Sequence, residues 1–280
     1  MVVQDIVSSN GWEPPNVDEL LWESSSFGGV VHSNSWGDDT TAYTERTARF
    51  DAYARVMPWS LALIAPGNSG EGVLEPANGR NVVAVSAIMK SLEGERWGSS
   101  AYGPTEAGTD GIFLLAPGSN IESAGADGFW DTNNNNLRLS SGTSMSTPHA
   151  SSAAVVIQQL YEDGWLVPAF APTTTHYLND MIPVWAETAP LGASVQLGEG
   201  FTPSGSLLRA SLAMAASPLP EATRNGGEGG HELHNPYDGW GALNLSRLYD
   251  PTTIEGLGES PAEDTSVSYT HLTLPTILLV

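Results

Sequence analysis

A serine at the start of a helix is the residue of this chain best placed to do chemistry. The segment SGTSMSTPHASSAAVV, residues 141–156, leads from Gly142 through Ser144 into a run of small residues that favours a helix. The first N–H groups of a helix lack partners within it, and the helix dipole is positive there, so negative charge is stabilised. Ser144 can therefore attack a carbonyl carbon while its own N–H binds the oxyanion that forms.

The same spacing also fits a capped, buried helix of small residues with no chemistry, so other segments must decide. NSWG (residues 34–37) and APGNSG (residues 65–70) lie upstream, each at the end of an apolar run. Together with GTSMSTPHA they resemble, in their residues and in their order along the chain, three motifs of the subtilase family of serine proteases. These are the substrate-binding edge strand, the strand end that carries the oxyanion asparagine, and the nucleophile motif.

The resemblance implies a role for each of the matching residues. Ser144 would be the nucleophile, and Asn68 would donate a hydrogen bond to the oxyanion. Two walls would flank the side chain that precedes the cut bond, and they would be formed by Ser35, Trp36 and Gly37 and by Ala65, Pro66 and Gly67. Apart from Trp36 these residues are small or apolar, so we expect an uncharged, apolar side chain in this position.

Two further segments extend the resemblance over roughly residues 2–250. APGSNI (residues 116–121) resembles a loop after a core strand, and GWGALNLSRL (residues 239–248) resembles the closing segment of the catalytic domain. The family hydrolyses peptide bonds, so the resemblance implies a polypeptide substrate and chemistry without a cofactor. It also implies a monomer and a location outside the cell or in its envelope, and it allows a structural calcium ion. Pro66 departs from the small residue usual at its position, which affects the expected shape of the pocket.

The base that should activate the serine is not evident. The subtilisin order of Asp, His and Ser places both partners upstream of the nucleophile. His32 alone of the histidines lies there, and its alternation with apolar neighbours is typical of a strand. Asp5 lacks the expected neighbours, and His149 should pack within the helix. We therefore expect that this chain begins inside the catalytic domain and lacks the catalytic Asp and His.

An α/β-hydrolase esterase is an alternative enzyme. GTSMS is one residue from the Gly-x-Ser-x-Gly elbow of that class, with Ser146 in place of the last glycine. That class orders its triad Ser, Asp, His, and Asp180, Asp238, His231 and His234 lie downstream of the serine. This alternative leaves NSWG and APGNSG unexplained.

A second alternative is an acidic binding module without catalysis. Asp131, Asn133 and Asn135 resemble the start of a calcium loop, but Asn136 and Gly142 stand where the loop needs Gly and Glu. HELH (residues 231–234) spaces its histidines differently from the HExxH zinc motif. Polar surface loops account for both segments, so no metal site is assigned.

Short apolar runs alternate with helical patterns, which predicts an α/β fold with a parallel sheet flanked by helices. The predicted strands are residues 2–7, 30–33, 60–65, 81–87 and 112–116. One predicted helix is capped by Asn16 and runs through Leu20 and Leu21. Three others are predicted over residues 45–57, 144–161 and 206–216. Residues 164–203 read as a long surface insertion.

Composition limits the class of protein and the partners that fit this chain. The chain has 280 residues, of which 40% are hydrophobic and 30 are glycine, which suits a globular protein with many turns. Its 32 acidic and 10 basic residues give a net charge of −22, which disfavours nucleic acid and anionic membranes as partners. Without cysteine it can form no disulfide and no thiolate metal site. Residues 1–250 form the predicted catalytic domain, 251–265 a linker, and 266–280 the start of a β-domain or a foreign tail.

Overall fold

The computed structural model describes most of the chain up to residue 248. The described residues are 1–4, 6–8, 11–12, 15–90, 95–125, 135–162, 166, 202–219 and 234–248. The predicted insertion lies almost entirely outside them, and so do the predicted linker and tail after residue 250. Asp5, Asp131, Asn133 and His231 also lie outside the described residues.

A six-stranded sheet forms the centre of the described part, in the order β3-β4-β5-β6-β10-β9. Its strands are β3 (Val31–Asn34), β4 (Leu61–Ile64), β5 (Val83–Ile88), β6 (Leu114–Pro117), β10 (Ala242–Leu243) and β9 (Ala216–Ser217). The first four strands are parallel and β10 runs parallel to β6, whereas β9 is antiparallel to β10. The sheet is therefore mixed but mostly parallel, and the α/β fold with a parallel sheet flanked by helices is confirmed.

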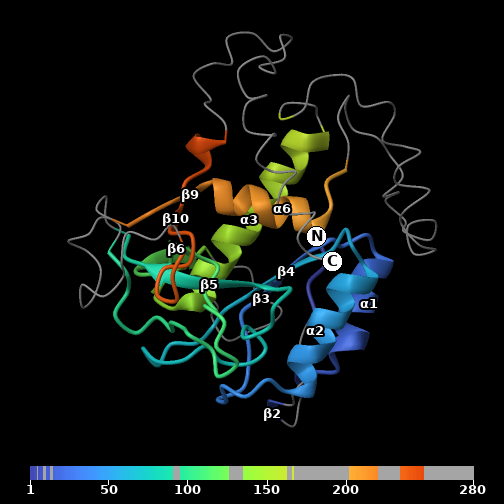
Figure 1. The fold of residues 1–280 in the computed structure, drawn as a ribbon, viewed down its shortest axis with the longest axis horizontal. Coiled ribbons are helices and arrows are strands. Elements are labelled where there is room, and N and C mark those ends of the chain that lie inside the picture. Colours follow the sequence, from blue (N-terminus) through green and yellow to red (C-terminus); the bar gives the residue numbers. More distant parts are fainter. Residues whose placement is uncertain are drawn as a thin grey trace.

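Helices cover both faces of this sheet. Helices α1 (Val17–Ser26) and α2 (Glu45–Val56) lie side by side on one face, and α3 (Thr143–Glu162) crosses the other face with α6 (Gly205–Met214) against it (Figure 1). The predicted caps are confirmed at α1, where the Asn16 side chain accepts a hydrogen bond from the N–H of Asp18. All four predicted helices are present, and for α2, α3 and α6 the ends differ from the predicted ones by at most two residues.

Alternation along the central strands decides which helices each side chain meets. Leu61 and Leu63 of β4 pack in the cluster beneath α3 and α6, whereas Ala62 and Ile64 pack in the cluster beneath α1 and α2. All four are buried, as expected of a parallel strand covered on both faces. The sheet thus separates two hydrophobic cores, and a residue's parity along a strand places it in one of them.

The predicted strand over residues 2–7 is wrong. Residues 1–4 have no regular structure, and Val3 is 81% exposed. The chain instead forms a small hairpin from β1 (Val7–Ser8) and β2 (Gly11–Trp12), apart from the main sheet. A run of valines makes a core strand only where a neighbouring strand and two covering layers bury it, and these residues have neither among the described parts.

A second hairpin, from β7 (Ile121–Ala124) and β8 (Leu137–Ser140), precedes α3. Its second strand, β8, has the sequence LRLS and ends three residues before α3 begins. The pairing of Ile121 with Ser140 brings the end of β6 and the start of α3 together. The hairpin therefore directs the chain into the segment that carries Ser144.

Candidate active site

Ser144 lies in the first turn of α3, as the sequence predicts, where backbone N–H groups are free of helical partners. A close approach at the end of β6 positions this turn. A Cβ atom built on Gly118 would lie 2.1 Å from Ser146 Oγ and 2.6 Å from Ala87 Cβ, so only glycine fits there. The N–H of Gly142 donates to the carbonyl oxygen of Gly118 at 2.8 Å, which anchors the residue before α3 to the sheet.

Asn68 docks against the same helix end. Thr143, the first residue of α3, donates to Asn68 Oδ1 twice, from its backbone N–H at 2.8 Å and from its hydroxyl at 3.0 Å. With both donors on the oxygen, the side-chain NH₂ of Asn68 is the group left to donate outward. Asn68 is exposed whereas Thr143 is fully buried. The side-chain NH₂ of Asn68 therefore lies at the surface, while its oxygen is held by a buried residue.

Ser35 contacts the nucleophile segment from the edge strand. Its hydroxyl donates to the carbonyl oxygen of Ser144 at 3.0 Å, across 109 residues of sequence. The structure therefore brings together Ser35, Asn68 and Ser144, one from each of the three motifs. Among the described residues, no hydrogen bond involves the hydroxyl of Ser144.

The other residues of the first predicted wall, Trp36 and Gly37, pack against the protein itself. Trp36 donates from Nε1 to Asn34 Oδ1 at 3.1 Å and lies against Phe50, with ring centroids 6.0 Å apart. A Cβ atom on Gly37 would lie 2.3 Å from the carbonyl oxygen of Glu75, so the chain at Gly37 touches the next loop. Trp36 thus contributes to the core beneath α1 and α2 as much as to a binding surface.

The second wall is fixed by backbone hydrogen bonds. The N–H of Ala65 donates to Asn34 O at 2.9 Å, and the carbonyl oxygen of Gly67 accepts from Ala101 N at 3.1 Å. Gly67 has a φ of +117°, a conformation that favours glycine, and a Cβ there would lie 2.8 Å from Leu74 Cδ1. Pro66 is buried, and its carbonyl oxygen accepts from Leu74 N at 2.9 Å.

His32 lies on the wrong face of the sheet for a base. It pairs in register with Ala62, which belongs to the core beneath α1 and α2, and its ring meets Tyr53 edge-on at 5.8 Å. Burial lowers the pKa of His32 from 6.5 to about 4. Its place on β3 agrees with the expectation that His32 is a strand residue, and α3 packs on the opposite face.

His149 differs from expectation in its surroundings. It is exposed on α3 rather than packed within the fold, because the helix turns residue 149 away from the sheet. Its Nδ1 lies 2.8 Å from the carbonyl oxygen of Met145, one helical turn back. His234, the other described histidine, pairs with Asp110 at 2.5 Å, so none of the three described histidines is bonded to Ser144.

In the described part of the chain, two kinds of feature are absent. There, no three His, Asp or Glu side chains converge in a way that could hold a metal ion. Within the same residues, no helix combines the length and apolarity needed to cross a bilayer.

Sequence reasoning missed Thr143, which orients the Asn68 amide. Its place beside the nucleophile in the string GTS was the available signal, since a hydroxyl at the first helical position can reach a neighbouring loop. It also missed Arg46, whose guanidinium bonds Asp38 and Glu75 just beyond the two walls. No local pattern marks that arrangement.

Comparison with known proteins places this geometry in a family. A model of the subtilase family matches residues 20–183, more than half of the chain. The chain belongs to the subtilase family. Family membership and the mostly parallel sheet together identify a subtilisin-like domain, and they favour a serine protease over an α/β-hydrolase esterase.

The relatives with curated descriptions are proteases. The subtilase domain is 38% identical over 102 residues to the thermostable alkaline protease of Halalkalibacterium halodurans, covering 36% of this chain and 24% of that protein. It is 36% identical over 141 residues to Subtilisin Savinase of Lederbergia lenta, covering 50% of this chain and 45% of that protein. The matches thus span less than half the length of either relative.

Solved structures share the subtilase fold. The prenylagaramide maturation protease PagA superposes with a TM-score of 0.56 at 17% identity, covering 86% of this chain and 69% of that one. Sphericase superposes with a TM-score of 0.53 at 20% identity, covering 86% and 66%. At these identities the likeness establishes the fold.

Proposed function

We propose that this chain carries the nucleophile and the oxyanion site of a serine endopeptidase. Ser144 Oγ would bond to the carbonyl carbon of a peptide and form an acyl-enzyme as the amine leaves with a proton, and water would then release the acid. The N–H of Ser144 and the side-chain NH₂ of Asn68 would hold the oxyanion. The observation that carries this proposal is the double hydrogen bond from Thr143, which leaves the Asn68 NH₂ free to donate beside the start of α3.

Labelling with a fluorophosphonate tests the nucleophile. We expect the label on Ser144, located by mass spectrometry, and none on the Ser144→Ala variant. Ser146→Ala is the matched control, because that serine lies two residues away and is fully buried, so its loss should leave the labelled site unchanged. A label that persists in Ser144→Ala, or that sits on another serine, would contradict the proposal.

We also propose that the base comes from outside the described residues and that this chain alone lacks the catalytic Asp and His. A serine hydroxyl is a weak nucleophile until a base takes its proton, and none of the described histidines is bonded to Ser144. Without its base, such a site retains roughly 10³–10⁴ of rate over water. A segment of the domain that carries Asp and His, added as a separate chain, should accelerate the labelling. Fast labelling of the chain alone that His32→Ala abolishes would instead make His32 the base.

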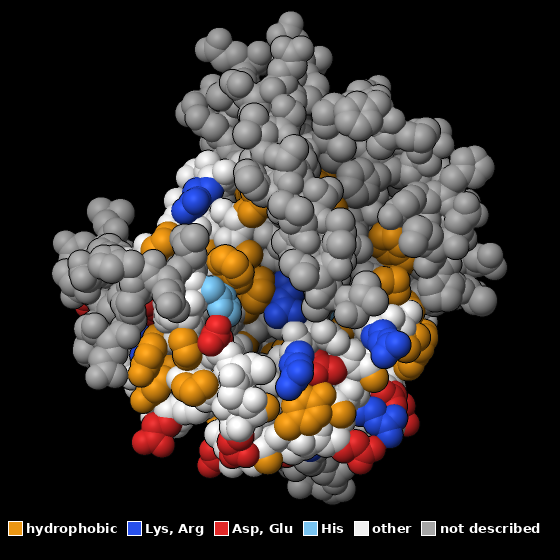
Figure 2. Space-filling model, in the orientation of Figure 1, with side chains coloured by type: hydrophobic (Ala, Val, Ile, Leu, Met, Phe, Trp, Pro, Cys, Tyr) orange, Lys and Arg blue, Asp and Glu red, His pale blue; other side chains and the backbone are white. Residues whose placement is uncertain are grey.

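The remaining features of the proposal follow from family and charge. We propose a polypeptide substrate, no cofactor in the chemistry, a structural calcium ion, a monomeric state, and a location outside the cell or in its envelope. The net charge of −22 opposes binding to nucleic acid or to an anionic membrane. Figure 2 shows acidic side chains spread along the lower edge of one face, with basic ones as separate spots rather than a continuous patch.

A further inference from the structure

A hollow of about 360 Å³ lies beside the proposed oxyanion site. It opens between two loops, residues 39–41 and residues 69–74. The first continues directly from the wall at Ser35–Gly37 and the second from Gly67 and Asn68. A side chain that precedes the cut bond and lies between these walls would therefore extend toward this hollow.

The protein's own atoms lie directly against both walls. Leu74 lies against Gly67, where an added Cβ would come within 2.8 Å of Leu74 Cδ1, and Gly37 lies against the carbonyl oxygen of Glu75. Leu74 and the Glu75 carbonyl therefore back the two walls directly. The open volume begins further out, where polar side chains line it.

Two carboxylates belong to this lining. Asp39 and Glu71 are both exposed at the hollow, and no Lys or Arg lines it. Within the described part of the chain, neither carboxylate forms an ion pair. A third acid, Glu106, accepts a hydrogen bond from the hydroxyl of Thr41 on the same loop. The hollow therefore carries negative potential with no compensating cation of its own.

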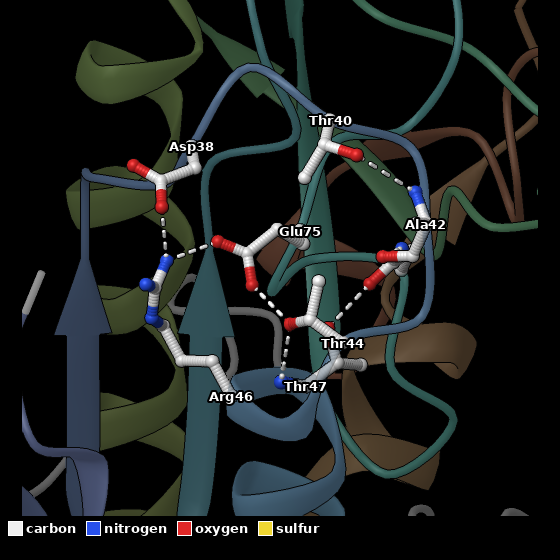
Figure 3. A network of polar contacts seen from close by, with 8 residues as sticks. Asp38, Thr40, Ala42, Thr44, Arg46, Thr47 and Glu75 are labelled. Carbon is white, nitrogen blue, oxygen red and sulfur yellow. Dashed lines mark hydrogen bonds and ion pairs between the residues drawn. The ribbon is translucent and has the colours of Figure 1, made fainter.

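A partly buried network fixes the two loops at their base (Figure 3). Arg46 of α2 donates to Asp38 Oδ2 at 2.7 Å and to Glu75 Oε1, and Glu75 is only 1% exposed. The hydroxyl of Thr44 donates to the other Glu75 oxygen, and the Glu75 N–H donates to Thr40 O at 2.9 Å. Arg46 is engaged by these two acids, so it holds the hollow in shape without neutralising Asp39 and Glu71.

We propose that this hollow selects a positively charged side chain, Lys or Arg, at the residue that precedes the cut bond. The inference rests on the proposed function, because the position of the cut bond follows from Ser144 and Asn68. It departs from the apolar preference that the composition of the walls suggests. Asp39 and Glu71 supply the attraction, and the fixed loops spare the substrate the cost of ordering them.

Peptide binding to the full chain in the Ser144→Ala form tests this, because that form cannot react. The probes are acetyl-Ala-Ala-Pro-Arg-amide and the same peptide with citrulline, which is neutral and nearly the same shape as arginine. We expect the arginine peptide to bind more tightly, with each carboxylate contributing about two- to fivefold, as exposed ion pairs do. The preference should shrink in 1 M NaCl, where the Debye length is about 3 Å.

Charge-neutral variants assign the effect to the hollow. Asp39→Asn and Glu71→Gln should each lower the preference for arginine, and the double variant should abolish it. Glu19→Gln, which removes an exposed carboxylate from α1, is the matched control and should keep it. Equal binding of the two peptides, no binding of either, or a preference that survives the double variant would overturn the inference. Since labelling of Ser144 is scored separately, failure of the proposed function is distinguishable from failure of this one.

Discussion

The side chain of Asn68 has two ends with separate tasks. Its oxygen accepts both hydrogen bonds from Thr143, which ties the loop after β4 to the start of α3. Its nitrogen is the group that could donate to an oxyanion. One residue thus joins the architecture of the site to its chemistry, and substitutions can separate the two.

We expect Asn68→Ala to lower kcat by roughly 10²–10³ with little change in KM, the loss known for removing one such donor from subtilisin. The measurement needs the protein together with its base. Asn68→Asp is the informative companion, because its carboxylate can still accept from Thr143 but has no N–H to donate. If Asn68 only shaped the turn, the aspartate variant would retain activity near that of the parent. A loss confined to KM would likewise assign Asn68 to substrate binding.

At the scale of the elements, the alternation of side chains along β3 determines which face of the sheet buries His32. Its ring is buried against Tyr53 in the core beneath α1 and α2, where a charged imidazolium would lose its hydration. Burial lowers the pKa of His32 to about 4 in the folded state, against 6.5 when exposed. Between these pH values the unfolded chain binds a proton that the folded chain does not, so stability falls as the pH drops through this window.

The size of this effect is about 3 kcal/mol once the pH is below 4, and about 2 kcal/mol at pH 5. Urea titrations at pH 7 and pH 5 would give the free energy of unfolding at each. We expect His32→Gln to lose less stability between the two pH values than the parent does. His149→Gln, which removes an exposed histidine, should behave like the parent. Equal pH dependence in all three proteins would contradict the assignment.

The elements themselves were largely predictable. The buried strands β4, β5 and β6 are short apolar runs bounded by Gly, Pro or Asn, and helices α1, α2 and α6 begin at polar caps. The two-residue strands β9 and β10 were not, because so short a segment shows no periodicity and becomes a strand only through its neighbours.

The site was predictable in part for a related reason. The motifs located Ser35, Asn68 and Ser144, which the structure brings together. The links through Thr143, Leu74 and Arg46 depend on which side chains meet after folding. Arg46 and Glu75, for example, stand 29 residues apart on a helix and a loop, so nothing in the local sequence relates them.

The charge of the whole molecule governs its response to salt. At −22 the folded chain repels itself, and dissolved ions screen that repulsion with a Debye length of about 8 Å at physiological ionic strength. We therefore expect the Tm to rise with NaCl from 0.05 M to 1 M, a range over which the Debye length falls to about 3 Å. Differential scanning calorimetry would measure it, and a constant Tm across the series would show that the charges are harmlessly dispersed.

Calcium adds a separate component to the same measurement. Millimolar CaCl₂ should raise the Tm more than MgCl₂ at equal ionic strength if a structural calcium ion binds, because Mg²⁺ demands smaller, near-octahedral sites. An equal rise in Tm with the two salts would contradict the proposed calcium site.

The hydrogen bonds that complete the site also set the order in which it can form. Ser35 reaches Ser144 across 109 residues, and Asn68 reaches Thr143 across 75. Closing such long loops costs entropy before any contact repays it, whereas α2 and α3 can form from local contacts. We therefore expect reactivity at Ser144 to appear in the last kinetic phase of refolding, after the sheet has formed. The hydroxyl of Ser144 in a newly made chain would then be held next to its oxyanion donors only when the fold is nearly complete.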